Sequence, residues 1–367
     1  AGTWCCNILT TALPEVFYWL PVTDKEGRPN RRLAITEKAS EFMDAAVEQT
    51  IRACPVWLPR ETRPDDWTSW EMKPSDDPRV AKGVTLIKTH FPDVENAVRA
   101  AIADGTMAPA LEGLSLLQSV PFTINTWVLE QVQKAFDHKL VFKKGMPRPH
   151  KLPVPKALTE EEKAQLSISN QILLAKRRQN IIDANSQRTG DISLFKQDMI
   201  TARRMAELPQ FYTPMTMDFR GRVYPVPKFN FQREDRVRGM FLFKNGAPIT
   251  QKGIHWLQVA VANCGAFDKV DKKPIPDRVK WVEDNMDLIR AYVSDPMGNT
   301  GWTKADSPFL FLASCRELVL CNGNPDYVCH LPVSFDGSCS GIQHLAAMTL
   351  SPEGAYVNLT NSDQPDD

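Results

Sequence analysis

The sequence predicts a predominantly helical α+β protein. Apolar residues recur at helical spacing through much of the chain, for example in GIHWLQVAVANCG (residues 253–265) and in residues 276–294. Short segments with strand propensity, at residues 83–88 and 222–226, interrupt these helices. The chain has 367 residues, which is long enough for two or three domains with their own cores.

Composition narrows the class of protein. The chain is 43% hydrophobic and 24% charged, as expected for a globular protein rather than a disordered one. No apolar stretch approaches the ~20 residues of a membrane span, and no secretory segment opens the chain, so a membrane is not an expected partner. The eight cysteines form no CxxC pair and no zinc-ligand spacing, which predicts reduced thiols in an intracellular protein.

Charge is unevenly distributed along the chain. The formal net charge is zero, yet residues 122–208 hold 15 Lys and Arg against 9 Asp and Glu. A local basic surface on a neutral protein suits a nucleic-acid channel with an acidic, metal-binding end. A solvated helical face is the alternative interpretation.

The first half of the chain is expected to be largely helical. Residues 1–53 read as mostly helix with a polar interruption at residues 23–32, and the start at Ala1 is expected to be trimmed. The segment CPVWLPRETRPDDWTSW (54–70) reads as an extended loop carrying aromatic anchors, because its prolines exclude a helix interior. Asn125 is the expected N-cap of a helix that reaches Phe136.

A projecting helical arm is expected next. The basic, proline-rich segment 138–156 reads as a linker, and Thr159 with Glu162 forms a capping-box signature. A long helix should then run to about residue 185, followed after a short turn by a second helix over residues 192–207. The first of these helices carries three successive basic residues, Lys176, Arg177 and Arg178.

The segment SFDGSCSGIQHLAAM (334–348) is the strongest chemical signal. Residues 333–335 read as a strand, and a helix beginning near residue 340 should pack Ile342, Leu345 and Ala346 inward. Asp336 then lies at a strand end, where its carboxylate and the Gly337 carbonyl could bind Mg²⁺, which favours hard oxygen ligands. A helix-capping aspartate is the alternative.

Other catalytic signatures fit less well. The same turn resembles a nucleophile elbow with Cys339 at its centre, but His344 follows on the same helix instead of facing the cysteine. We interpret His344 as a helix-surface residue or a hydrogen-bonding neighbour of the metal ligands. The sequence contains no GxxxxGK[ST], HExxH or GxGxxG motif.

A second candidate site lies in MDFRGRVYPVPKFN (217–230). Arg220 and Arg222, separated by Gly221, could straddle a backbone phosphate, and Tyr224 offers a flat face on which a base could stack. Pro225 indicates a strand at a sheet edge. A surface loop with an Asp218–Arg220 ion pair is the alternative.

Both segments resemble the single-subunit RNA polymerases of phages and mitochondria. SFDGSCSGIQHLAAM is similar to motif A of that family, and MDFRGRVYPVPKFN resembles its Asp-x-x-Gly-Arg segment. Further segments resemble the family in order, among them LQSVPFTINTWVLEQVQ (117–133) and ADSPFLFLASCREL (305–318), so the resemblance covers essentially the whole chain.

The resemblance implies a function and a set of roles. Asp336 would be the first catalytic aspartate of two-metal nucleotidyl transfer with Mg²⁺, and Gly337 would add its carbonyl. Arg222, with Arg220 and Tyr224 nearby, would hold the template side of the hybrid, and the helices with Lys176, Arg177 and Arg178 would form the thumb. Template DNA, RNA product and ribonucleoside triphosphates are the implied partners.

The resemblance also implies an incomplete right-hand architecture. Residues 1–121 would be part of the amino-terminal domain, 122–208 the thumb, and 209–367 a partial palm with a helical insertion at about 247–326. The fingers and the second catalytic aspartate are missing from the sequence, so we expect a fragment, or a split polymerase whose second chain carries them and without which it is inactive. A phage-infected bacterium or a mitochondrion is the expected location.

Two other classes remain open. A non-catalytic nucleic-acid-binding module derived from a polymerase would bind duplex or hybrid without a partner. A cysteine hydrolase would depend on a reactive Cys339.

Overall fold

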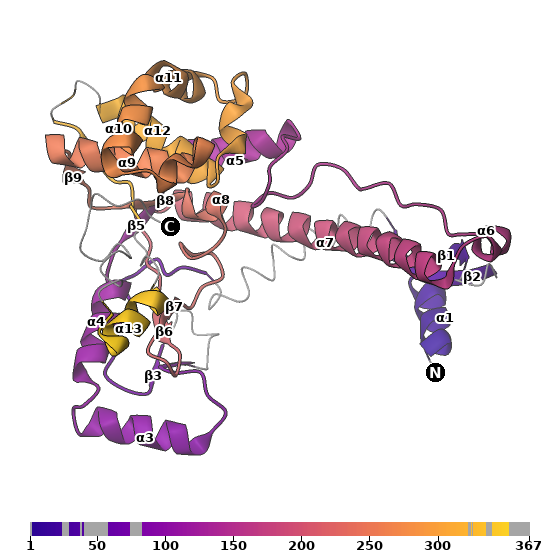
Figure 1. Cartoon of the computed structure of the whole chain (residues 1–367). Coiled ribbons are helices and arrows are strands. Elements are labelled where there is room, and N and C mark those ends of the chain that lie inside the picture. The colour runs from indigo at the N-terminus through magenta and orange to yellow at the C-terminus, as the bar shows by residue number, and fades with distance from the viewer. Residues whose placement is uncertain are drawn as a thin grey trace. The chain divides into compact units, whose positions relative to one another are not determined.

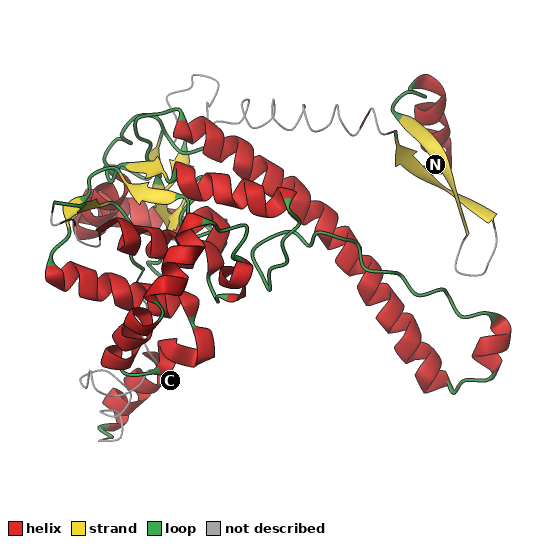
Figure 2. Ribbon diagram, turned by 90° about the horizontal axis from the view of Figure 1, so that it is seen from above, coloured by secondary structure: helices red, strands yellow, loops and turns green. Residues whose placement is uncertain are grey.

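The protein is described by a computed structural model over residues 2–23, 29–36, 39, 58–73, 83–321, 324, 326–334 and 340–351. Its residues cluster into two compact units, Ala1–Trp57 and Leu58–Asp367. Helices account for most of the described chain, and the strands pair only two at a time (Figures 1 and 2). The predicted helix-rich α+β class is therefore confirmed.

In its described residues, the first unit contains a helix followed by two paired strands. Helix α1 (Gly2–Ala12) is followed by strands β1 (Phe17–Thr23) and β2 (Pro29–Ile35), which pair antiparallel. The mostly helical prediction is thus wrong over β1 and β2. The run FYWLPVT has the aromatic and β-branched residues that favour a strand, and Pro21 within it disfavours a helix. Arg31 also lies over the Trp19 ring, 5.4 Å from its centroid.

The second unit holds the remaining elements. Its first half comprises β3 (Glu71–Met72), β4 (Val84–Thr85), α3 (Pro92–Ala103), α4 (Ala108–Gln118), β5 (Phe122–Ile124), α5 (Thr126–Asp137), α6 (Glu160–Ala164) and α7 (Ile168–Ala206). Its second half comprises β6 (Met215–Met217), β7 (Val223–Pro225), α8 (Asp235–Arg238), β8 (Phe241–Phe243), β9 (Ala247–Pro248), α9 (Gln251–Gly265), α10 (Ile275–Asp284), α11 (Met286–Ser294), α12 (Pro308–Cys321), β10 (Val328–Cys329) and α13 (Ser340–Thr349).

The main core of this unit is built around α12, which packs against α5, α8, α9 and α11. Phe309, Phe311 and Leu312 of α12 are fully buried, so this helix is apolar on most of its circumference. Strand β5 pairs with β8, and Phe122 stacks on Phe243 across that pair at 5.5 Å. The core therefore joins segments that are more than a hundred residues apart in the sequence.

A second core lies beneath the proline–tryptophan segment. Trp67 and Trp70 are each 3% exposed and pack with Leu86, Leu114 and Met215. The Trp67 indole N–H donates to the Met215 carbonyl at 3.1 Å. For residues 58–70 this confirms the predicted loop with aromatic anchors. Residues 54–57 lie outside the described part of the chain.

Helix α7 differs from the prediction. The capping box at Thr159 and Glu162 is present, but it begins the five-residue helix α6, and α7 then runs unbroken for 39 residues. The predicted turn between residues 185 and 192 is therefore wrong. The polar residues there indicated a turn, yet Asn185 hydrogen-bonds Leu152 of the linker instead of its own backbone.

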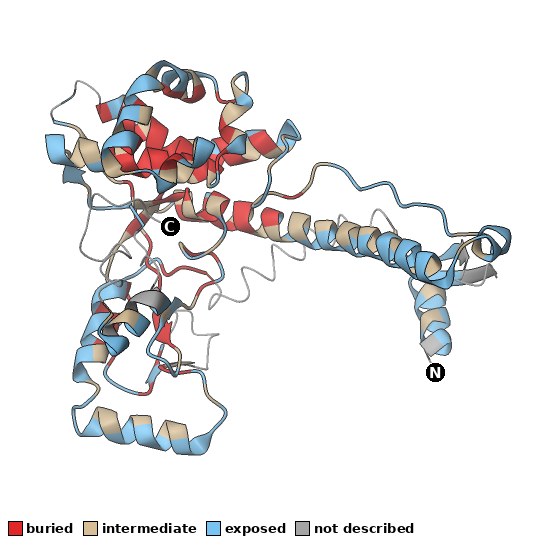
Figure 3. Ribbon diagram, viewed as in Figure 1, coloured by how far each residue is buried: buried red, intermediate tan, exposed pale blue. Residues whose placement is uncertain are grey.

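The two ends of α7 differ in burial (Figure 3). Its last turns bury Phe195, Asp198, Met199, Ala202 and Met205, whereas Ile168, Ile172 and Leu173 near its start are exposed. Between these ends the linker lies along the helix. Arg178 and Arg188 donate to the carbonyls of Pro155 and Pro149, at 3.0 and 2.8 Å.

The carboxyl-terminal elements partly match the prediction. Helix α13 begins at Ser340, as predicted, but Leu345 is 60% exposed, so the expected inward packing is wrong at that position. The strand expected at residues 333–335 is wrong at its first two positions, and Phe335 lies outside the described residues. Val333 and Ser334 have no regular structure, and the strand of this segment, β10, lies at Val328–Cys329 against β9.

Candidate nucleic-acid interface

The turn between β6 and β7 is organised by the Asp218 carboxylate. Its Oδ1 atom accepts hydrogen bonds from the main-chain N–H groups of Arg220 and Arg222, at 2.8 and 3.0 Å. The two strands also close main chain to main chain, because the Asp218 N–H donates to the Arg222 carbonyl at 2.8 Å. Gly221 has φ +77°, a conformation that other residues adopt only with strain. The Asp-x-x-Gly-Arg pattern thus encodes a tight, fixed loop.

The Arg220 side chain is bonded within this loop. Its guanidinium donates through Nε and Nη2 to Asp218 Oδ2, at 2.9 and 2.7 Å. Partial burial acts to raise the pKa of the Asp218 carboxyl, but hydrogen bonds from the Arg220 side chain and the main chain outweigh it and lower the pKa. The ion pair that the sequence left as an alternative is therefore present.

Arg222 differs from Arg220 in the pairing of its side chain. Among the residues that the structure describes, its guanidinium has no hydrogen bond or ion pair. Tyr224, 38% exposed, stands next to it on β7 and lies 3.4 Å from Asp218 Oδ2 through its hydroxyl. Phe219, at the tip of the loop, is 78% exposed. One free guanidinium beside two accessible aromatic rings is an arrangement that can bind a phosphate and stack on a base.

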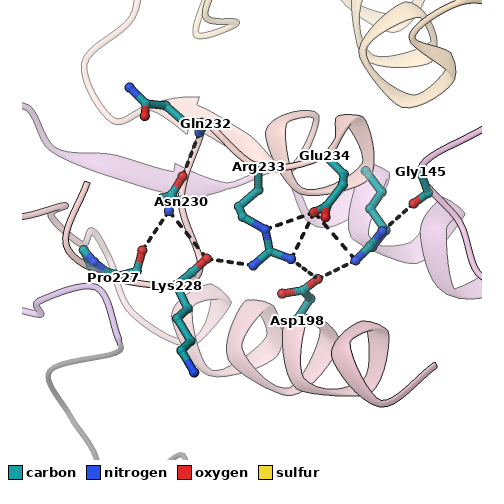
Figure 4. Close-up of polar contacts among 9 residues, drawn as sticks. Gly145, Asp198, Pro227, Lys228, Asn230, Gln232, Arg233 and Glu234 are labelled. Atoms are coloured by element: carbon teal, nitrogen blue, oxygen red, sulfur yellow. Dashed lines mark hydrogen bonds and ion pairs between the residues drawn. The ribbon is translucent and has the colours of Figure 1, made fainter. Parts of the chain in front are cut away.

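A buried ion network fixes the end of α7 (Figure 4). Arg236 of α8 donates to Asp198 Oδ2 at 2.7 Å, and Arg233 reaches the same oxygen at 3.3 Å. Arg236 also donates to the Gly145 carbonyl of the linker, and Arg233 to the Lys228 carbonyl at 2.8 Å. The network joins α7, the linker, α8 and the segment after β7.

Burial governs the electrostatics of this network. The Asp198 and Arg236 side chains are each 5% exposed. Desolvation raises the pKa of the Asp198 carboxyl, and the attraction of Arg233 and Arg236 opposes that rise without cancelling it. The pair is a positional constraint more than a source of stability, because desolvating two charges offsets most of their attraction.

The basic residues on α7 are not equivalent. Lys176 and Arg177 are exposed, and within the described chain neither has a polar partner. Arg178 is half-buried, and its Nε donates to the Pro155 carbonyl. Of the three residues on α7 that were predicted to bind nucleic acid, two are available to a ligand and one holds the linker.

The predicted metal ligands fall outside the described residues. Asp336, Gly337 and Cys339 belong to the segment 335–339, of which nothing is described. His344 is exposed on α13. In the described part of the chain, no group of three or more His, Cys, Asp or Glu residues could hold a metal ion. The geometry therefore leaves the predicted Mg²⁺ site at Asp336 as a prediction.

Sequence reasoning missed the buried network. Asp198, Arg233 and Arg236 were not predicted, because charged residues at helical spacing read as a solvated face. One signal was available: Asp198 lies among Phe195, Met199 and Ala202 on the apolar side of the helix. A charge on an apolar face predicts a buried partner.

Comparisons with known proteins give the family context. The sequence model of the DNA-dependent RNA polymerase family matches residues 247–367. The DNA-directed RNA polymerase of Enterobacteria phage K11 is 34% identical over 289 residues, which cover 77% of this chain and 30% of that protein. This chain is a relative of the single-subunit DNA-directed RNA polymerases.

Two further relatives, one phage polymerase and one mitochondrial polymerase, are similar to this chain. The T7 RNA polymerase of Escherichia phage T7 is 42% identical over 168 residues, covering 45% of this chain and 19% of that protein. The mitochondrial DNA-directed RNA polymerase of Neurospora crassa is 32% identical over 326 residues, covering 84% of this chain and 22% of that protein. The resemblance inferred from the sequence is confirmed. The chain spans less than a third of the length of these three polymerases.

None of the helices described is both long and apolar enough to cross a bilayer.

Proposed function

We propose that this chain forms part of a DNA-dependent RNA polymerase and supplies its thumb and its first catalytic aspartate. Template DNA, the RNA product and ribonucleoside triphosphates are the proposed ligands. The observation that carries the proposal is the loop at Asp218–Arg222, which presents one free guanidinium, in a chain related to RNA polymerases over most of its length.

Within this proposal each residue of the loop has a separate role. Arg222 binds a backbone phosphate of the RNA–DNA hybrid, and Tyr224 contacts a neighbouring base or sugar. Arg220 keeps the loop closed through Asp218. Lys176 and Arg177 add two cations on α7, which acts as the thumb and retains the duplex behind the growing end.

Magnesium is the proposed cofactor on grounds of ligand chemistry. The Asp336 carboxylate and the Gly337 carbonyl are hard oxygen donors of the kind that Mg²⁺ prefers. When bound, Mg²⁺ would stabilise the charge that develops on the α-phosphate during attack by the RNA 3′-hydroxyl. A two-metal site needs a second carboxylate, and we propose that another part of the assembled polymerase supplies it together with the fingers.

The binding part of the proposal can be tested on the purified chain. We expect it to bind an RNA–DNA hybrid with an affinity that falls as salt concentration rises, measured by fluorescence anisotropy. Arg222→Ala should weaken binding and reduce the salt slope by about 1, because one phosphate contact is lost. Arg290→Ala, which removes an exposed arginine of α11 that is paired with Asp287, is the matched control.

The outcomes separate the two candidate classes. Binding that depends on neither salt nor Arg222 would contradict the proposed interface. Salt-dependent binding in a complete assembly that never incorporates ribonucleotides would favour the non-catalytic module instead.

A further inference from the structure

Residues 326–334, here termed the approach segment, lead the main chain to the proposed catalytic residue Asp336. The segment is short of regular structure: only Val328–Cys329 form a strand, paired with Ala247–Pro248. It nevertheless contacts three other elements at defined atoms. These contacts fix the position of the main chain up to Ser334, two residues before Asp336.

The start of the approach segment is fixed at Tyr327. The Ile249 N–H donates to the Tyr327 carbonyl at 2.9 Å, and the Tyr327 hydroxyl donates to Glu317 Oε2 of α12 at 2.7 Å. Glu317 is 6% exposed, so this hydroxyl satisfies a buried carboxylate. The segment is thereby tied to the most buried helix of the core.

His330 ends the strand pairing by using its side chain. The Phe243 N–H donates to the His330 carbonyl, and the His330 Nδ1 atom lies 2.9 Å from the Phe243 carbonyl. A carbonyl oxygen can only accept, so Nδ1 must carry the proton in this contact. The imidazole thus takes the place of the His330 main-chain N–H, which would bond the Phe243 carbonyl if the two residues formed an ordinary antiparallel pair. The main chain after His330 is consequently free to leave the strand direction.

Gly246 allows the segment to pack this closely. A Cβ atom at Gly246 would lie 2.6 Å from Val328 Cγ1, 2.8 Å from the Cys329 carbonyl oxygen and 2.8 Å from His330 Cε1. Main-chain oxygen cannot rotate away as a flexible side chain can. Any larger residue would therefore push the approach segment off β8 and β9.

The far end of the segment is held by α8. Arg238 Nη2 donates to Ser334 Oγ at 3.1 Å, two residues before Asp336. The same helix contributes Arg236 to the network at the end of α7. One short helix therefore contacts both the helix proposed as the thumb and the approach to the proposed catalytic residue.

We propose that His330 is a positioning residue for nucleotidyl transfer: its Nδ1–H bond to the Phe243 carbonyl fixes the approach segment, which ends two residues before Asp336. The inference rests on the proposed function of Asp336. His330 lies outside the segment 334–348 that contains Asp336, so the sequence pattern alone does not indicate this role.

The test compares three histidine variants in the complete polymerase that contains this chain. His330→Asn keeps an N–H donor near the position of Nδ1, whereas His330→Leu fills similar space without one. The control is His138→Leu, since His138 Nδ1 also lies 2.8 Å from a carbonyl, that of Lys134, at the exposed end of α5.

Two readouts are measured for each variant. His330→Leu should speed amide hydrogen exchange in residues 326–334 by about fivefold or more, as expected for one lost hydrogen bond. It should also slow single-ribonucleotide addition by about tenfold or more, because small displacements of reacting groups are costly. KM for nucleotide and affinity for hybrid should stay within about twofold, and His330→Asn and His138→Leu should match the wild type in both readouts.

Each outcome decides one question. Wild-type exchange or a wild-type addition rate in His330→Leu would overturn the positioning role. A wild-type preparation that adds no ribonucleotide to a primed template would overturn the proposed function, and the exchange comparison would still decide whether His330 fixes the segment. Gly246→Ala should reproduce the slow addition, with Gly113→Ala as control, because a Cβ at Gly113 would meet no atom within 4 Å.

Discussion

Arg236 Nη2 lies 2.7 Å from Asp198 Oδ2, and both side chains are almost completely buried. This contact pairs α8 with the last third of α7 inside the core. Because Arg233 shares the same carboxylate, the end of the long helix is fixed at two points of the segment that follows the Arg-Gly-Arg loop. The exposed part of α7 therefore extends from an end that is fixed in the core.

The first prediction concerns this fixed end of α7. Arg236→Leu should lower the free energy of unfolding by about 3 kcal/mol, because it leaves the buried Asp198 carboxylate with only the longer contact to Arg233. Denaturant unfolding monitored by tryptophan fluorescence measures the change. Arg290→Leu is the control: its 2.9 Å pair with Asp287 is exposed, so the loss should stay within about 0.5 kcal/mol. Equal losses in the two variants would contradict the account.

The second prediction concerns the loop. Asp218→Ala should weaken binding to an RNA–DNA hybrid, although removing a negative charge would by itself strengthen it. The reason is geometric, because Asp218 holds the main-chain N–H groups of Arg220 and Arg222. Fluorescence anisotropy at fixed salt gives the affinity. Asp66→Ala removes an exposed carboxylate paired with Arg63 and should leave the affinity unchanged or raised. A gain in affinity for Asp218→Ala would show that the loop does not need its carboxylate.

The third prediction concerns pH. Asp235 accepts the Phe309 and Leu310 N–H groups at the start of α12, but burial outweighs these bonds and raises its pKa to about 6 from an ordinary 3.8. A folded-state pKa above the unfolded one gives stability that is greatest below about pH 4 and is lost as pH rises to about 6. Asp235→Asn should lack this loss, so its stability relative to wild type should rise over that interval and level off above it. Parallel stability curves for the two proteins would refute the assignment.

The fourth prediction concerns the linker along α7. Asn185 exchanges two hydrogen bonds with the Leu152 main chain, at 2.8 and 2.9 Å. Asn185→Ala should release the linker locally and speed tryptic cleavage after Lys151 severalfold, since proteolysis follows local opening. Asn180→Ala, on an exposed stretch of the same helix, should cleave at the wild-type rate. An unchanged rate in Asn185→Ala would mean that the linker is held elsewhere.

Local signals in the sequence were sufficient for several elements. The Asn125 cap and the Thr159–Glu162 capping box are present, because both depend on residues within one helical turn. The buried tryptophans at 67 and 70 followed from their size and apolar character. The Asp218–Arg220 pair was foreseen as an alternative because the two residues lie close together in one glycine-containing turn.

Non-local contacts account for what was missed. Helix α7 continues through Gly190 and its polar neighbours because the linker, 33 and 40 residues earlier, bonds the side chains of Asn185 and Arg188. Strands β1 and β2 depend on pairing with each other, and the strand at Val328–Cys329 depends on a partner eighty residues away. Asp198 and Arg236 are 38 residues apart, so no short pattern joins them.

The central claim is that Asp336 catalyses nucleotidyl transfer in an RNA polymerase. Its most direct test is template-directed incorporation of a single ribonucleotide by the complete polymerase that contains this chain, comparing Asp336→Asn with Asp326→Asn, a change at an exposed carboxylate of the approach segment. The account predicts that Asp336→Asn loses incorporation by several orders of magnitude while retaining hybrid binding, and that Asp326→Asn keeps the wild-type rate. Incorporation by Asp336→Asn near the wild-type rate would contradict it.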